Sequence, residues 1–124
     1  ARLPWGASLV PNFLGLPPPL PGERPLTVAF VGRLSHEKGP DLFAALSQAA
    51  PGPRYEVFGD GPLRAACEAA APGVVFHGAR AGMAGAWAGV GLLAITSRAE
   101  GLPLAALEAM AHGVPVLAFA VGGL

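Results

Sequence analysis

The sequence is poor in cysteine, in lysine and in charge overall. Its 124 residues include one cysteine, Cys67, which excludes a disulfide framework. A single lysine, Lys38, and the scattered arginines balance the 8 acidic residues, so there is no basic stripe and we expect no nucleic-acid partner. Only 13% of the residues are charged and 52% are hydrophobic, which excludes a disordered chain and indicates one small domain with its own core.

One long stretch without charge, between Arg80 and Arg98, is just long enough to span a membrane. Glycines interrupt it, and this favours a short helix, a glycine turn and a buried strand, so we expect no transmembrane segment. The sequence begins at Ala1 without a charged-then-apolar leader, and we expect a cytoplasmic location. It stops at Leu124 directly after an apolar run, so both ends look cut from a longer protein.

Proline divides the sequence into two parts. The prolines before Leu26 are too frequent for a helix and predict a stiff, extended linker over residues 1–25. From residue 26 onward, short apolar runs alternate with alanine-rich stretches, which is typical of repeated strand and helix units on a parallel sheet. We therefore expect residues 26–124 to form a single α/β domain that is incomplete at its C-terminal end.

The alternation predicts five strands and four helices. The strands are expected at 26–32, 55–59, 74–78, 91–97 and 114–118, and the helices at 41–50, 62–71, 81–88 and 103–112. Most of these strands are nearly continuous apolar runs, as expected for strands covered on both faces. The pattern predicts a Rossmann-like, doubly wound parallel sheet with strand order 3-2-1-4-5, which reverses between the first and fourth strands.

Most of the charge in the folded part follows the carboxyl ends of the predicted strands. Arg33 and Lys38 follow the first strand, Arg80 follows the third, and Glu100 follows the fourth. Ligands of open parallel sheets bind beyond these ends, at the point where the strand order reverses. We therefore expect Arg33, Lys38 and Glu100 to face one another across a crevice.

Glu108 is isolated in an apolar helix. Apart from the titratable His112, it is the only charged side chain after Gly101. A buried carboxylate is costly unless it accepts hydrogen bonds, so Glu108 must reach a ligand or find an internal donor; a salt bridge or a surface turn would also explain it. It lies about 7.5 Å along the helix axis from Pro103. A diphosphate at the helix start would place its ribose beside this carboxylate.

Three motifs resemble those of the GT-B glycosyltransferases of family four, which retain anomeric configuration. Residues 31–39, Val-Gly-Arg-Leu-Ser-His-Glu-Lys-Gly, resemble the family's first phosphate loop, with His36 where proline is common. Residues 58–63, Phe-Gly-Asp-Gly-Pro-Leu, resemble its second glycine turn. Residues 97–116 are the most specific, because they contain the Glu-x7-Glu motif as Glu100 and Glu108. The resemblance runs from about Val10 to the last residue and covers the donor-binding, C-terminal half of the family's fold.

The resemblance implies that this half binds a nucleotide-sugar donor such as a UDP- or GDP-hexose. Arg33 and Lys38 would bind the diphosphate, and Glu108 would bind the ribose hydroxyls. Fixed cations would stabilise the charge that develops on the departing phosphate. The sequence has no Asp-x-Asp pair and no His or Cys cluster with ligand spacing, so we expect neither a metal nor a cofactor.

Further residues take roles through the same resemblance. Glu100, with the amides of Gly101 and Leu102, would contact the transferred sugar, so that Glu100 completes a catalytic set with the two cations of the phosphate loop. The loop from Gly78 to Arg80 would flank the base.

The resemblance also implies that parts of a complete enzyme lie outside this sequence. The acceptor-binding N-terminal domain is missing, and with it the catalytic histidine that some members carry. We therefore expect the chain alone to bind donor weakly and to transfer nothing, and the full-length enzyme to be cytoplasmic or peripheral at the membrane. Missing helices would leave an apolar patch uncovered, through which we expect self-association.

Two other functions fit part of the pattern. A GT-B nucleotide-sugar epimerase shares the architecture, although the surroundings of Glu-x7-Glu would then be coincidental. A non-catalytic Rossmann-type nucleotide-binding module is disfavoured because no Gly-x-Gly-x-x-Gly follows a predicted strand. Among single residues, Asp60 between two glycines is more typical of a turn than of a ligand site, and His77 and Trp87 are more typical of packing residues.

Overall fold

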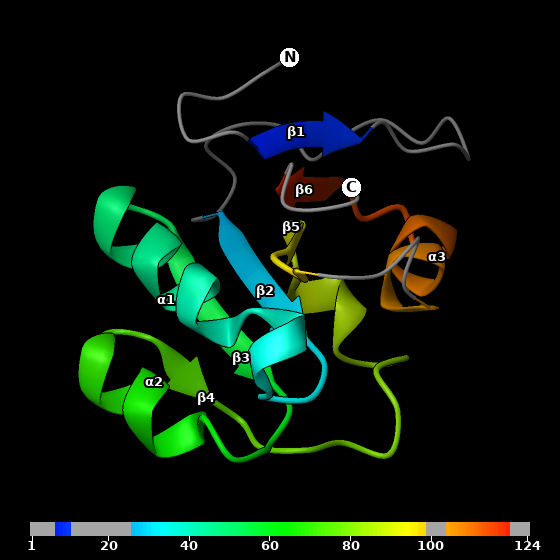
Figure 1. The fold of residues 1–124 in the computed structure, drawn as a ribbon. Helices are drawn as coiled ribbons and strands as arrows, with labels where there is room; N and C mark the ends of the chain where they lie inside the picture. The colour runs from blue at the N-terminus through cyan, green and yellow to red at the C-terminus, as the bar shows by residue number, and fades with distance from the viewer. Residues whose placement is uncertain (1–6, 11–25, 99–103, 120–124) are drawn as a thin grey trace.

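The computed structural model describes residues 7–10, 26–98 and 104–119. They form a six-stranded sheet with helices against both faces (Figure 1). The elements in chain order are β1 (Ala7–Val10), β2 (Thr27–Val31), the 3-10 helix η1 (His36–Lys38), α1 (Pro40–Ala49), β3 (Arg54–Phe58), α2 (Arg64–Ala70), β4 (Val75–Phe76), the 3-10 helix η2 (Trp87–Gly89), β5 (Leu92–Ile95), α3 (Leu104–Ala111) and β6 (Val116–Phe119). No helix among the described residues is long and apolar enough to cross a membrane.

The strand order confirms the predicted doubly wound topology. The sheet runs β1-β6-β5-β2-β3-β4, and all of its pairs are parallel except β1 with β6. The five predicted strands correspond to β2 to β6, and their order in space is the predicted 3-2-1-4-5. The reversal therefore lies between β2 and β5, where Val28 pairs with Leu92 and Ala29 with Leu93.

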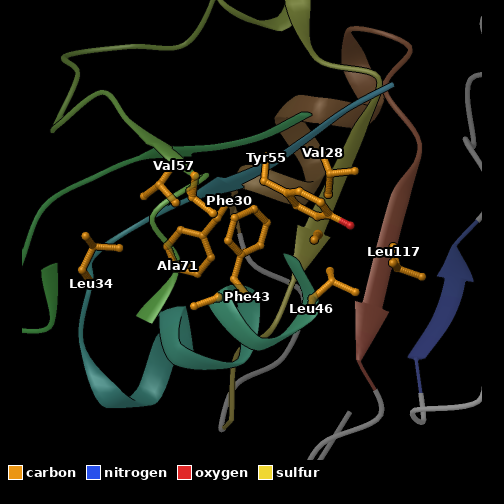
Figure 2. Close-up of a cluster of buried hydrophobic side chains, with 12 residues drawn as sticks. Val28, Phe30, Leu34, Phe43, Leu46, Tyr55, Val57, Ala71 and Leu117 are labelled. Atoms are coloured by element: carbon orange, nitrogen blue, oxygen red, sulfur yellow. The ribbon is translucent and has the colours of Figure 1, made fainter. Parts of the chain in front are cut away.

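One face of the sheet packs against α1 and α2. Phe43 of α1 is 1% exposed, and its ring lies between those of Phe30 and Tyr55, with centroids 5.6 and 5.8 Å away. Figure 2 shows these rings meeting between α1 and the sheet, with Val57 and Leu34 beside them. Alternation along β2 places Val28 and Phe30 in this cluster, so the sheet buries apolar side chains here as a doubly wound fold requires.

The other face of the sheet packs against α3 and the segment around η2. Ala29 of β2 and Leu93 of β5 point into this layer. Trp87 is the bulkiest side chain there and is 2% exposed, and Met110 of α3 completes the cluster. Because both faces are covered, the edge at the carboxyl ends of the strands is the part of the sheet left for a ligand.

The helix predicted over residues 81–88 is wrong. This stretch consists of turns followed by the three-residue η2. Gly82 and Gly85 interrupt it and Gly89 follows directly, and each glycine costs a helix about 1 kcal/mol relative to alanine. Met83 and Trp87 still anchor the segment to the sheet, so burial of individual side chains holds it in place without helical structure.

The other predicted strands and helices differ from the structure by one or two residues at their ends, and one of these differences has a clear physical reason. The strand predicted at 74–78 is reduced to Val75–Phe76, because it is the edge strand β4 and the chain turns away at Gly78, whose φ is +82°. The prediction of a linker over residues 1–25 is wrong for Ala7–Val10. These residues form β1 and pair antiparallel with β6, with Ala7 opposite Phe119. The many prolines on both sides of this strand favoured the prediction of a linker, although none of the four strand residues is proline.

Candidate functional site

A cavity of about 300 Å³ opens at the point where the strand order reverses. That volume lies at the lower end of the range for small-molecule sites, which is about 300–1,000 Å³. Its walls come from the carboxyl ends of β2 and β5, from the loop after β2, and from the first turns of α3. The lining residues are Phe30, Val31, Gly32, Lys38, Leu93, Ala94, Ile95, Thr96, Ser97, Leu104, Ala105 and Glu108.

The cavity brings together a cation and an anion that are 70 residues apart in the sequence. Lys38 ends η1 and Glu108 lies in the middle of α3, and both line the cavity while remaining half-buried. The surrounding wall is apolar apart from Thr96 and Ser97 at the end of β5. The site thus presents one ammonium and one carboxylate to a ligand at the edge where sequence analysis placed the crevice.

The loop that carries Lys38 is supported from the β3 side. The amide of Gly32 donates to the carbonyl of Phe58 at 3.1 Å, and the amide of Leu34 donates to the carbonyl of Asp60 at 3.0 Å. A Cβ at Gly59 would lie 1.8 Å from the carbonyl oxygen of Gly32, so only glycine fits there. The two predicted glycine-containing loops are therefore one packed unit, in which the second loop supports the first.

Asp60 is the turn residue that sequence analysis favoured. Its carboxylate accepts hydrogen bonds from the Gly61 amide at 2.8 Å and from Arg64 at 2.9 Å. The bond from the Gly61 amide, followed by that from Arg64, lowers the pKa of this carboxyl group. Asp60 thus fixes the turn before α2. It is not among the described residues that line the cavity.

The end of β5 holds the other side of the Lys38 loop. Thr96 is fully buried, and its hydroxyl donates to the carbonyl of Gly39 at 2.7 Å. Gly39 adopts the left-handed conformation, with φ +68°, and caps both η1 and α1. A Cβ at Gly39 would lie 2.0 Å from the Thr96 carbonyl oxygen, so the loop can approach β5 this closely only through glycine.

Arg98 forms a second tie between the two loops. Its guanidinium donates to both carboxylate oxygens of Asp41, at 2.8 and 2.5 Å, and to the carbonyl of His36 at 2.7 Å. The hydrogen bonds between Arg98 and Asp41 lower the pKa of Asp41 and raise that of Arg98, so both groups stay ionised around neutral pH. No sequence pattern predicts this bidentate pair, because its partners are 57 residues apart.

Glu108 accepts a hydrogen bond from an internal donor, and it also lines the cavity. The indole Nε1–H of Trp87 donates to Glu108 Oε1 at 3.0 Å. Trp87 is also a packing residue, as expected, because it is 2% exposed. The hydrogen bond offsets part of the cost of keeping the carboxylate half-buried.

The remaining predicted site residues are distributed differently. Arg33 is exposed in the same loop as Lys38, one residue beyond Gly32, and is not among the described residues that line the cavity. Glu100, Gly101 and Leu102 lie outside the described residues. Their roles, like those of Lys38 and Glu108, stay predictions.

Gly78 and Arg80 follow β4, the edge strand that β3 separates from β2. The Arg80 guanidinium carbon lies 5.0 Å from the centroid of the Phe58 ring, and the His77 ring stacks on the same ring with centroids 4.5 Å apart. His77 also pairs with Glu56 at 2.6 Å. A second groove, of about 370 Å³, is lined by Arg80, Phe58, His77 and Glu56. Among the described residues, no group of three or more His, Cys, Asp or Glu side chains could hold a metal ion.

Comparison with known proteins identifies the class to which this fold and site belong. Residues 25–124 match the family model described as glycosyl transferases group 1. The chain therefore belongs to the group 1 glycosyltransferases, whose solved members share the GT-B architecture. The structure is similar to that of the Anabaena protein HepE in complex with UDP and glucose, with a TM-score of 0.69 and 29% identity, over 80% of this chain and 30% of that one.

Two curated relatives are similar in sequence. A 2-deoxystreptamine N-acetyl-D-glucosaminyltransferase of Streptomyces fradiae is 40% identical over 119 residues, covering 85% of this chain and 28% of the relative. A GDP-mannose-dependent alpha-mannosyltransferase of Mycobacterium tuberculosis is 38% identical over 105 residues, covering 83% and 27%. The chain thus spans somewhat more than a quarter of each of these relatives.

Proposed function

We propose that this chain is the donor-binding domain of a retaining, family-four glycosyltransferase that moves a hexose from a nucleoside-diphosphate sugar to an acceptor. The proposal rests on one observation: Lys38 and Glu108 line the same cavity, at the point where the strand order reverses. The similarity to a protein solved with UDP and glucose supports a nucleotide-sugar ligand. The name of the mycobacterial relative, which specifies GDP-mannose, supports the same ligand class.

In this proposal the diphosphate lies against Lys38 and the amides at the end of β2. Glu108, further along α3, accepts hydrogen bonds from the two ribose hydroxyls, because an ionised carboxylate is an acceptor for paired donors. Arg33 reaches the diphosphate from the exposed side of the loop. Gly78 and Arg80 flank the base from the loop after β4.

Catalysis would rest mainly on stabilising the leaving group. As the bond between the anomeric carbon and the phosphate oxygen breaks, negative charge grows on the diphosphate, and Lys38 and Arg33 offset it without moving. Glu100 and the amides of Gly101 and Leu102 hold the sugar, and the acceptor hydroxyl attacks from the face that the phosphate leaves, giving its proton to the departing phosphate oxygen. With these cations in place the reaction needs no metal and no cofactor.

The remaining parts of the enzyme would come from outside the chain. An N-terminal domain supplies the acceptor site, so the chain alone binds donor and transfers nothing, and we place the complete enzyme in the cytoplasm or at the membrane surface. Leu104 and Leu107 of α3 are 79% and 49% exposed. They form the candidate apolar patch for self-association of the chain.

Replacing Lys38 by alanine tests the proposed function. We expect the dissociation constants of UDP and GDP, measured by NMR titration, to rise at least about tenfold, because a charge-assisted hydrogen bond contributes about 1.5–3 kcal/mol. Binding of uridine, which has no phosphate, should not change. Arg54→Ala is the matched control. Arg54 is a cation at the N-terminal end of β3, away from the cavity, and it pairs with Glu56. Equal losses in the two variants, or no binding of either diphosphate to the wild type, would contradict the proposal.

A further inference from the structure

Trp87 contacts Glu108, a residue that lines the cavity. It opens η2, and its indole Nε1–H lies 3.0 Å from Glu108 Oε1 on α3. The residue is not among the described residues that line the cavity. The contact joins two elements on the same face of the sheet, 21 residues apart in sequence.

The indole ring is itself held firmly. It is 2% exposed within the cluster that includes Met83 and Met110. The ring of His112 stacks on it with centroids 6.2 Å apart, and His112 Nδ1 lies 2.9 Å from the backbone oxygen of Glu108. The Trp87 amide donates to the carbonyl of Met83 at 3.1 Å, which closes the turn before η2. The donor that meets the carboxylate is therefore fixed in position.

We propose that Trp87 is a positioning residue that orients the Glu108 carboxylate toward the ribose and thereby makes the site select ribose over deoxyribose. This inference rests on the proposed function. An indole N–H donates and cannot accept, so it binds one carboxylate oxygen and holds the Glu108 side chain in one rotamer. A carboxylate has about four acceptor sites, so a donor on Oε1 leaves acceptor capacity for ligand hydroxyls.

A purely structural role makes a different prediction. If the contact only satisfied a buried indole donor, its loss would lower stability and would weaken all ligands alike. If it orients the carboxylate, its loss should weaken only those ligands that carry hydroxyls for Glu108 to bind. Preorganisation of this kind strengthens binding because less side-chain freedom is lost when the ligand arrives.

The test compares Trp87→Phe with the wild type, using UDP and 2′,3′-dideoxyuridine diphosphate as ligands in NMR titrations. The wild type should prefer UDP by about tenfold, the effect of losing a hydrogen bond to a charged group. Trp87→Phe keeps an aromatic ring but has no N–H, and it should lose most of that preference while binding the dideoxy ligand as the wild type does. A preference that survives the substitution overturns the role of Trp87 and leaves the proposed function intact. Failure of the wild type to bind UDP, or to prefer it, overturns both.

A second measurement avoids the variant in case it folds poorly. The indole ¹H–¹⁵N resonance of Trp87 in the wild type, assigned with Trp5→Phe, should shift when UDP is added. It should stay in place with pyrophosphate alone or with the dideoxy ligand, because neither supplies hydroxyls to the shared carboxylate. A resonance that responds equally to all three ligands would overturn the proposal.

Discussion

Replacing Glu108 by alanine is expected to weaken the binding of UDP and GDP by about 10- to 150-fold. The estimate corresponds to about 1.5–3 kcal/mol, the contribution of hydrogen bonds made by a charged group. The side chain lines the cavity and stands half-buried among apolar neighbours, so water replaces it poorly. Calorimetry or NMR titration of the chain with each nucleotide measures the loss directly.

The controls for this prediction separate binding from folding. Glu108→Ala removes the acceptor of the buried Trp87 N–H, whereas Glu108→Gln keeps an acceptor oxygen and removes the charge. We expect the glutamine variant to fold like the wild type and still to bind nucleotide more weakly. Glu68→Ala removes an exposed carboxylate of α2 that pairs with Arg64, and it should bind as the wild type does. Unchanged affinity in both Glu108 variants would contradict the ribose-binding role.

Gly39→Ala is expected to lower the free energy of unfolding by about 2–5 kcal/mol. The left-handed backbone costs about 1–2 kcal/mol for a residue with a Cβ, and overpacking adds about 1–3 kcal/mol. The clash is with backbone, because the new Cβ would lie 2.0 Å from the Thr96 carbonyl oxygen. Since Lys38 precedes Gly39, the displaced loop should also bind nucleotide diphosphates more weakly. Urea unfolding and NMR titration measure the two effects.

A second glycine provides the matched control for Gly39. Gly73 has no heavy atom within 4 Å of a built Cβ, and its φ is not positive. Gly73→Ala should therefore change stability by less than about 1 kcal/mol in either direction. If the Gly39→Ala variant were as stable as the Gly73→Ala variant, the result would contradict the close contact between the loop and the end of β5.

The fold was largely predictable because most of its strands and helices are marked by apolar runs, prolines and glycines within the element or next to it in the sequence. Apolar runs such as 91–97 indicate strands covered on both faces, and proline and glycine mark where α3 begins and ends. The segment 81–88 was not predictable in the same way, since its alanine content favours a helix while its glycines oppose one. β1 depends on pairing with β6, more than 100 residues away, and four residues carry no local signal for that contact.

The candidate site was predictable to the extent that topology determined it. Charged residues after parallel strands meet at one edge, which is why Lys38 could be expected at the crevice. The expectation for Glu108 came instead from its isolation in an apolar helix whose start is a potential anion site. The pair of Arg98 with Asp41 and the bond from Trp87 to Glu108 could not be expected, because each joins residues that only the packed structure brings into contact. The isolation of Glu108 did indicate that the carboxylate needs a ligand or an internal donor, but not that Trp87 is the donor.

The central claim is that one ligand bridges the ammonium of Lys38 and the carboxylate of Glu108. A crystal structure of the chain with UDP tests it most directly. The account predicts the diphosphate in contact with Lys38 and the ribose hydroxyls about 3 Å or less from Glu108. UDP bound instead in the groove beside Phe58, with neither side chain touching it, would contradict the account.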